Sequence, residues 1–368
     1  MTTAPLRVLC AGGGTGGHVY PGIALAQRFQ SRCPGTEVSF LGGRGGMEER
    51  LVPQEGFRLQ TVWVKALKGR SRLAQVGALL VLGIGTLQAL RILWRVRPHL
   101  VIGTGGYVMG PAVLAATILR QPRVILEQNL RPGMTVRFLT RLAHRVFTSF
   151  PETVAYLPTA QVECTGNPVR QEICDVGRGE MTSYGAYLHL LIVGGSQGAH
   201  RINQAVVEAL PLLSKHHRQI WVVHQTGAAD FDSVAQAYRG TPLKSEVRPF
   251  LYDMAARYRW AHLLICRAGA TTLAELTACG KPSILVPYPY AADDHQRLNA
   301  RILQQQGAAQ VILDTELTGT RLYEALHQFV EAPEKLRSQA ACSRRLGRPQ
   351  AADTIVTACL RLLNVGEN

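Results

Sequence analysis

The residues from Cys266 to Ala300 gather polar side chains that could bind a ligand. They follow two short apolar segments, His262–Cys266 and Ser283–Val286, which the pattern predicts to be buried strands. In open α/β sheets, ligands bind just beyond the carboxyl ends of neighbouring strands. This stretch is therefore the first candidate for a binding site, and its second loop carries Asp293, Asp294, His295, Gln296 and Asn299.

Glu275 has two interpretations. Thr272-x-x-Glu275 fits a capping box, in which the glutamate accepts a backbone N–H of its own helix. Alternatively, Glu275 lies one turn into a helix that opens at Thr271 and Thr272 and ends near Cys279. There it would accept hydrogen bonds from both hydroxyls of a ribose, as a carboxylate can. Spacing alone leaves both interpretations open.

A glycine loop near the N-terminus could bind a phosphate. Leu6–Ala11 predicts a strand, Gly12–Gly17 reads GGGTGG, and a helix is expected near Pro21–Gln30. This order of elements turns backbone N–H groups toward an anion. His18 follows directly, and an imidazole, whose ordinary pKa is near neutrality, could take a proton from an attacking hydroxyl. A structural role for His18 in the turn stays open.

The loop lacks the other features of two common nucleotide-binding motifs. The next predicted strand ends in Gly42-Gly43-Arg44, without the acidic residue that dinucleotide-binding folds place there. No Gly-Lys-Ser/Thr follows, so a P-loop NTPase is excluded. Two further glycine loops, 103–106 and 194–199, also follow predicted strands. Glu127, Gln128 and Asn129 follow another predicted strand. These three polar side chains could line a site or cap a helix.

The order of these elements predicts two βα domains. We expect an N-terminal domain over 1–168 and a C-terminal domain over 169–345, with a final helix at about 346–368 that packs back onto the first. Residues 163–170 are expected to form a turn without regular structure. Gln171–Tyr187, with three glycines, is expected to be an exposed loop.

The composition narrows the classes of protein further. Hydrophobic residues make up 46% of the 368 residues, which indicates a folded chain. The eight cysteines are scattered and form no C-x-x-C pair, so we expect no structural metal and a reducing compartment. The N-terminus passes directly into a strand and glycine loop, so no signal peptide is expected.

The net charge of +15 is unevenly placed. Residues 56–126 contain no Asp or Glu. Such a one-signed region indicates an anionic partner, such as nucleic acid, a membrane surface or a phosphorylated substrate. Nucleic acid is disfavoured because basic and aromatic residues are not interleaved on a recognisable module. The basic residues of the stretch are Arg58, Lys65, Lys68, Arg70, Arg72, Arg91, Arg95, Arg97, Arg120 and Arg123.

Leu73–Leu90 is an uncharged segment inside this basic region. As a helix it would be about 27 Å long, marginally enough for a bilayer. Its glycines, its polar residues and its basic flanks argue against a full span. Two interpretations remain: a buried helix of the α/β domain, or a partly exposed helix whose leucines enter a membrane surface, with Lys and Arg beside it on an anionic leaflet.

Six motifs in order carry a resemblance. Together they resemble the MurG family, the N-acetylglucosaminyltransferases of peptidoglycan synthesis, over nearly the whole chain. They are the first loop with His18, Gly103–Tyr107, Glu127–Asn129, Thr165–Arg170, Gly194–Ala199 and Cys266–Ala300.

The resemblance implies the GT-B fold, two Rossmann-like doubly wound parallel-sheet domains that face each other across a cleft. It implies transfer of N-acetylglucosamine from UDP-GlcNAc, with inversion, to the 4-hydroxyl of muramoyl-pentapeptide on undecaprenyl pyrophosphate. It implies no cofactor and no metal, since loop N–H groups, helix N-termini and an arginine can hold a diphosphate. The expected place is the cytoplasmic face of the bacterial plasma membrane, as a peripheral enzyme of cell-wall biogenesis, cell shape and division.

The resemblance also assigns residues. His18 and Glu127 are the catalytic candidates. Glu275 would hold the ribose, Gln296 the sugar, and Arg170 and Ser196 the phosphates. The full expected donor site is Thr15, Gly16, Gly17, Asn129, Arg170, Ser196, Leu251, Ala270, Thr271, Thr272, Leu273, Ala274, Glu275 and Gln296. The alternatives are a diacylglycerol glycosyltransferase, a UDP-GlcNAc 2-epimerase and a nucleotide-sugar binding protein without turnover.

Overall fold

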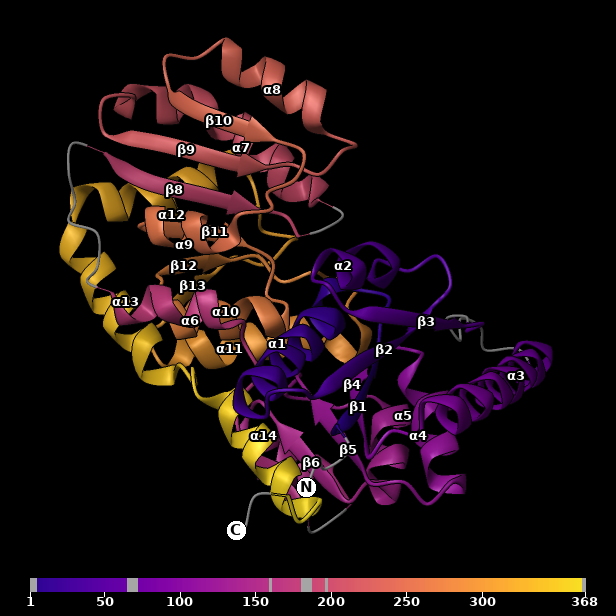
Figure 1. Cartoon of the computed structure of the whole chain (residues 1–368). Helices are drawn as coiled ribbons and strands as arrows, with labels where there is room; N and C mark the ends of the chain where they lie inside the picture. Colours follow the sequence, from indigo (N-terminus) through magenta and orange to yellow (C-terminus); the bar gives the residue numbers. More distant parts are fainter. Residues whose placement is uncertain (1–4, 65–71, 159–160, 180–186, 196–197, 366–368) are drawn as a thin grey trace. The chain divides into compact units, whose positions relative to one another are not determined.

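The computed structural model describes residues 5–64, 72–158, 161–179, 187–195 and 198–365, with the backbone alone for 72–79. The chain forms two compact units (Figure 1). Unit 1 contains Met1–Arg170 and Pro349–Asn368, and unit 2 contains Gln171–Arg348. Each unit is built on a parallel sheet.

The described part of unit 1 has a seven-stranded sheet in the order β3-β2-β1-β4-β5-β6-β7. The strand order reverses between β1 and β4, which is the position where doubly wound sheets bind ligands. The strands are β1 Arg7–Gly12, β2 Glu37–Gly43, β3 Arg58–Val62, β4 Leu100–Gly105, β5 Arg123–Glu127, β6 Arg145–Thr148 and β7 Val162–Cys164.

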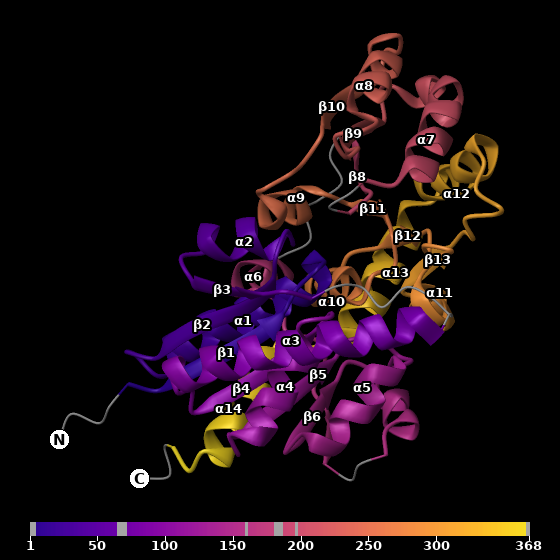
Figure 2. The same cartoon turned by 90° about the vertical axis from the view of Figure 1, so that its right-hand side faces the viewer.

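Helices cover both faces of this sheet. Successive side chains of a strand point to opposite faces, so Val8 and Cys10 of β1 pack with α1 and α14, whereas Leu9 and Ala11 pack with α3 and α4. Figure 2 shows α3, α4 and α5 on one side of the unit. The helices are α1 Gly16–Arg32, α2 Glu48–Gln54, α3 Arg72–Val96, α4 Met109–Ile118, α5 Met134–Leu139 and α14 Ala351–Leu362, with the short 3-10 turns η1 Thr140–Leu142 and η2 Pro151–Tyr156.

The described part of unit 2 has a six-stranded sheet in the order β10-β9-β8-β11-β12-β13. Its strands are β8 Leu188–Val193, β9 Ile220–Gln225, β10 Lys244–Arg248, β11 Leu263–Cys266, β12 Ser283–Leu285 and β13 Ala309–Val311. Its helices are α6 Gln171–Arg178, α7 His200–Leu213, α8 Phe231–Arg239, α9 Met254–Trp260, α10 Ala270–Cys279, α11 His295–Gln305, α12 Gly319–Glu331 and α13 Pro333–Leu346, with 3-10 turns η3 Ser214–His216 and η4 Ala292–Asp294.

Two local predictions are wrong. Residues 171–178, expected to be an exposed loop, form helix α6, which buries Ile173, Cys174 and Val176. Gly177 was a misleading loop signal: a Cβ at this position would collide with the carbonyl oxygen of Ala278 in α10, so glycine permits two helices to pack closely. The expected turn 163–170 begins inside β7, which pairs with β6.

Helix α3 is longer than the predicted segment 73–90 and is only partly buried. Ala89 and Leu93 contribute to the core, whereas Leu80, Leu87 and Trp94 are about two-thirds exposed. Among the described residues, no helix has both the length and the apolar character needed to cross a membrane. Lys65, Lys68 and Arg70 of the basic flank lie outside the described residues.

Candidate active site

In unit 1 the first two glycine loops pack against each other at the carboxyl ends of β1 and β4. A Cβ on Gly106 would collide with the Gly13 carbonyl, and one on Gly105 would collide with the His18 ring. Both Gly105 and Gly106 have positive φ angles, 111° and 76°, which favour glycine. The absence of side chains at these positions brings the two loops together beside His18.

His18 is held by its own loop. Helix α1 begins at Gly16 with Thr15 as its N-terminal capping residue, so Gly16, Gly17 and His18 form the first turn. The His18 Nδ1 atom lies 3.1 Å from the Gly13 carbonyl oxygen and 3.3 Å from the Thr15 hydroxyl. The ring is half-buried, so it is positioned and still accessible to a substrate hydroxyl.

Glu127 ends β5 at the same edge of the sheet. Its side chain is 4% exposed, and one carboxylate oxygen accepts the Asn129 backbone N–H at 2.8 Å. Burial raises the pKa of Glu127 to about 7, although hydrogen bonds from Asn129 oppose the shift. A carboxyl group with a pKa near neutrality can exchange a proton during a reaction at physiological pH. The neighbouring Gln128 is also buried, and its amide nitrogen donates to the Thr104 carbonyl at 2.6 Å.

Arg170 is the last residue of the first segment of unit 1. Its guanidinium carbon lies 4.5 Å from the centre of the Tyr20 ring on α1, and Nη1 is 4.0 Å from the Glu55 carboxylate. The side chain is buried. The contact with Tyr20 places this permanently charged group against the helix that follows the first glycine loop.

In unit 2 one buried side chain, Gln225, joins two segments that are predicted to bind the sugar-nucleotide donor, the third glycine loop and the segment at Leu251. The Gln225 amide nitrogen donates to the Gly195 carbonyl at 2.9 Å, and its oxygen accepts the Leu251 backbone N–H at 3.0 Å. Gln225 thereby fixes the third glycine loop relative to the segment at Leu251. Ser196, the predicted phosphate contact in this loop, lies outside the described residues.

The structure excludes one of the two interpretations of Glu275. Helix α10 begins at Ala270 with Gly269 as its capping residue, so Thr272 is inside the helix and the capping-box interpretation does not hold. Instead, Glu275 Oε2 accepts the Tyr258 hydroxyl at 2.8 Å. Burial and the Glu275 charge raise the pKa of Tyr258, so the phenol stays a donor. The glutamate is 8% exposed and is oriented by a neighbouring helix.

The other residues of the 270–274 run alternate in exposure along α10. Ala270, Thr272 and Ala274 are half-buried, whereas the Leu273 side chain is in the core. A contact of Leu273 with a ligand would therefore involve its backbone. The first turn of α10 also presents N–H groups at the positive end of a helix dipole.

The loop after β12 is braced by two side chains. Arg267 Nη1 donates to the carbonyl oxygens of Val286 and Pro287 and lies 2.5 Å from an Asp314 carboxylate oxygen. Gln296 is at the start of α11, where its side-chain oxygen accepts the Tyr288 N–H at 3.0 Å. Gln296 is thus placed at the carboxyl end of β12, in the same unit as Glu275.

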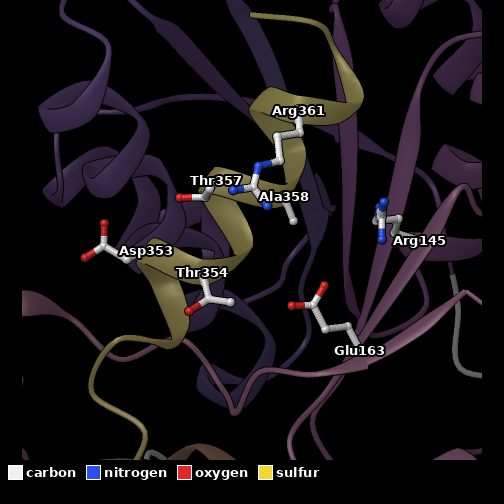
Figure 3. A pocket seen from close by; sticks show the side chains of 7 residues that line it. All are labelled: Arg145, Glu163, Asp353, Thr354, Thr357, Ala358 and Arg361. Atoms are coloured by element: carbon white, nitrogen blue, oxygen red, sulfur yellow. The ribbon is translucent and has the colours of Figure 1, made fainter. Parts of the chain in front are cut away.

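A different pocket, of about 310 Å³, lies beside α14 in unit 1. Figure 3 shows Arg361 and Asp353 on this helix and Arg145 and Glu163 on β6 and β7. Arg145 is at the amino end of its strand, away from the glycine loops. With two basic and two acidic residues the pocket favours neither sign of ligand. Within the described ranges, no three His, Cys, Asp or Glu side chains are grouped as metal ligands.

Two parallel-sheet units with glycine loops at the carboxyl ends of their strands have the architecture of the GT-B class of glycosyltransferases. The comparison with known families agrees. Residues 8–148 match the glycosyltransferase family 28 N-terminal domain and residues 189–355 match its C-terminal domain. The chain belongs to glycosyltransferase family 28 and, within it, to the MurG family of N-acetylglucosaminyltransferases, as its full-length relatives show.

A protein of Anaeromyxobacter dehalogenans (strain 2CP-C) named UDP-N-acetylglucosamine--N-acetylmuramyl-(pentapeptide) pyrophosphoryl-undecaprenol N-acetylglucosamine transferase is 45% identical to this chain. The match covers 97% of this chain and 93% of the relative. A protein of the same name from Geotalea daltonii is 45% identical over 95% of this chain and 96% of its own length. The predicted class of enzyme, a hexosyltransferase, is thereby confirmed.

Solved structures show the same fold. The crystal structure of Acinetobacter baumannii MurG superposes with a TM-score of 0.76 at 31% identity, covering 97% of this chain and all of that one. A UDP-N-acetylglucosamine 2-epimerase structure has a TM-score of 0.72 at 14% identity, covering 100% and 98% of the two chains. The second likeness shows the fold alone.

Proposed function

We propose that this enzyme transfers N-acetylglucosamine from UDP-GlcNAc to the 4-hydroxyl of undecaprenyl-pyrophosphoryl-N-acetylmuramoyl-pentapeptide, with inversion at the anomeric carbon. The observation that carries the proposal is the set of three oriented side chains, His18 and Glu127 in unit 1 and Glu275 in unit 2. They occur in a chain that matches relatives named for this transferase over nearly their full length.

We assign the proton transfer to unit 1. His18 takes the proton of the acceptor hydroxyl as that oxygen attacks the anomeric carbon and UDP departs from the opposite face, which produces the inversion. Glu127, with a pKa raised to about 7, is the second candidate for a proton-transfer role at this edge of the sheet. Thr15, Gly16 and Gly17 beside His18, and Asn129 beside Glu127, are the donor contacts that we propose for unit 1.

We assign donor binding largely to unit 2. Glu275, oriented by Tyr258, accepts the hydroxyls of the ribose. The third glycine loop, the first turn of α10 and Arg170 stabilise the diphosphate through N–H groups and charge, which requires no cation. Leu251 and Gln296 contact the remainder of the nucleotide sugar. Most of these donor-binding groups are backbone N–H groups or side chains on helices. Their positions are therefore fixed before the reaction, and they can stabilise the negative charge that develops on the leaving UDP.

The lipid-linked acceptor requires a site on a membrane, and we propose peripheral binding to the cytoplasmic face of the plasma membrane through α3. Leu80, Ile84 and Leu87 are exposed at helical spacing, and Trp94 extends the same series. Arg91 and Arg95 lie on the same helix and are also exposed. Exposed apolar side chains beside basic ones favour an anionic bilayer surface.

UDP release from UDP-GlcNAc, measured in EDTA with and without a short-chain lipid-linked muramoyl-pentapeptide, tests the proposal. Acceptor-dependent release together with a new disaccharide is the expected result. Epimerisation of UDP-GlcNAc without acceptor would instead identify a 2-epimerase, and transfer to diacylglycerol would identify a different acceptor class. Loss of release in EDTA would contradict the metal-free binding of the diphosphate.

A further inference from the structure

We infer that Glu48, through the peptide group between Gly13 and Gly14, sets the proton position and the basicity of the His18 ring. Glu48 would then be a positioning residue for the reaction. The inference rests on the proposed role of His18 as the base, but the link between the two side chains can be measured without any substrate.

Glu48 is a buried carboxylate at the first position of α2, with a side chain that is 1% exposed. Its Oε2 accepts the Gly14 N–H at 2.9 Å, and its Oε1 accepts the Gly43 N–H at 2.7 Å. Both oxygens therefore act as acceptors, which is the hydrogen-bonding pattern of an ionised carboxylate. The negative charge lies directly behind the first glycine loop.

The chain leaves room for this carboxylate by having glycine on several sides. A Cβ built on Gly13, Gly42 or Gly46 would collide with the Glu48 side chain. One position in the first glycine loop, one in β2 and one in the loop after β2 thus lack a side chain where Glu48 fits. Glu48 therefore does more than cap its own helix, because its carboxylate accepts N–H groups from the first glycine loop and from β2.

The link to His18 is one peptide group. The Gly14 N–H and the Gly13 carbonyl belong to the same planar unit and point in opposite directions. The N–H donates to Glu48, and the carbonyl oxygen lies 3.1 Å from His18 Nδ1. A carbonyl oxygen only accepts hydrogen bonds, so Nδ1 must carry the proton for this bond to form. Nε2 is then the nitrogen with the lone pair, the one that can act as the base.

The charge of Glu48 also reaches the ring electrostatically. A carboxylate that accepts the N–H of a peptide increases the negative charge on the carbonyl oxygen of that peptide, because hydrogen bonds in a chain polarise one another. The stronger carbonyl acceptor stabilises the protonated imidazole that forms when His18 takes a proton. In serine proteases, an aspartate does this by direct contact with the histidine. Here a peptide group stands between the two side chains.

Other titratable groups act on the same part of unit 1. Glu127 ends β5, and Arg170, which is 4.0 Å from the Glu55 carboxylate, packs against Tyr20 on the helix that carries His18. All of them remain in a variant that changes Glu48 alone. A matched control is also available, because Glu49 is the next residue of α2, is exposed, and accepts the Gly45 N–H at 3.1 Å, away from the first loop.

The first measurement uses the wild-type chain. In protein labelled with ¹⁵N-histidine, with His18 assigned by comparison with His18→Gln, the nitrogen chemical shifts report which ring nitrogen is protonated. A neutral ring with its proton on Nδ1 is the expected result. A ring protonated on Nε2 would overturn the inference, and this outcome does not depend on whether any variant folds.

The second measurement compares Glu48→Gln with Glu49→Gln. Glutamine at position 48 retains the shape of the side chain but has one acceptor oxygen and no charge. In folded Glu48→Gln, the midpoint of the His18 titration should move to lower pH and the Nδ1–H form should lose population, with neither change in Glu49→Gln. The expected fall in kcat is about tenfold, part of the 10²–10⁴-fold that a positioned base supplies, whereas KM for UDP-GlcNAc stays within about twofold.

A folded Glu48→Gln chain with an unaltered His18 titration would refute the link. The proposed function can fail separately: if the titration shifts as expected but His18→Ala retains full kcat, Glu48 still orients the ring, and the base of the reaction is another residue. Glu48→Asp, which retains the charge on a shorter side chain, should recover part of the His18 shift.

Discussion

Replacing Glu275 with alanine should weaken UDP binding and, separately, destabilise unit 2. The carboxylate is 8% exposed and accepts the hydroxyl of Tyr258, itself almost fully buried, at 2.8 Å. Alanine removes the acceptor proposed for the ribose hydroxyls. It also removes the acceptor of a phenol that has little access to water.

Both effects can be given a magnitude. A hydrogen-bond partner that carries a charge contributes about 1–3 kcal/mol to binding, which corresponds to about a 5- to 150-fold increase in Kd for UDP. A buried hydroxyl that loses its acceptor costs about 1–3 kcal/mol of folding free energy. The double variant Glu275→Ala/Tyr258→Phe should regain much of this stability, because no orphaned hydroxyl remains, but should bind UDP as weakly as Glu275→Ala.

Titration calorimetry with UDP and with 2′,3′-dideoxy-UDP, together with urea unfolding, separates the two effects. The loss of affinity in Glu275→Ala should appear with UDP and vanish with the analogue that lacks the diol. Tyr258→Phe, which keeps the carboxylate, should weaken UDP binding by less than Glu275→Ala. A folded Glu275→Ala chain that binds UDP as tightly as wild type would refute the ribose assignment.

Three further outcomes are expected. Burial raises the pKa of Glu127 from 4.5 to about 7, so between these values the folded chain holds a proton that the unfolded chain has lost. The free energy of unfolding should therefore fall as pH rises through this window, by about 3 kcal/mol in all, and urea titrations of Glu127→Gln should lack that slope. Gln225→Leu removes two hydrogen bonds between predicted donor segments and should raise the Kd for UDP about tenfold by calorimetry; an unchanged Kd would mean that the segments hold their positions without it. Leu80→Ser/Leu87→Ser should lower the partition constant for anionic vesicles, measured by flotation, by about thirtyfold, at about 1 kcal/mol per leucine, whereas Val365→Ser, a control at another exposed apolar position, should not; equal partitioning of both variants would refute docking through α3.

The class of fold was predictable because its signals are local. The buried parallel strands β4 and β8 read as short apolar runs, and both lead into glycines that permit a tight turn. These signals do not depend on the rest of the chain. Helix α6 was not predicted because glycine, which is typical of loops, also occurs where two helices pack closely. Gly177 permits close packing with α10, and sequence alone does not distinguish this from a loop.

The candidate side chains could be identified from the sequence, but the groups that orient them could not. Glu48 meets Gly14 from 34 residues away, Gln225 meets Leu251 from 26, and Tyr258 meets Glu275 from 17. Each pair joins two different elements, so its formation depends on strand order and helix placement. The capping box failed for a related reason: Thr272-x-x-Glu275 has the right spacing, but α10 begins earlier than that motif implies.

Helix α14 has a consequence for the synthesis of the protein. Its residues Ile355, Val356 and Cys359 lie in the same core cluster as Val8 and Cys10 of β1, and Arg28 of α1 donates to Asp353 at 2.6 Å. Unit 1 is thus completed by a segment that the ribosome makes only after all of unit 2, residues 171–348.

At about 5–20 residues per second, the nascent N-terminal segment waits roughly 10 to 40 s for α14 to emerge. During that interval, one face of its sheet exposes apolar residues that α14 later covers. Such a surface is a binding site for chaperones and a starting point for aggregation. Expression conditions that slow translation through unit 2 should therefore lower the yield of this protein more than conditions that slow its first 170 residues.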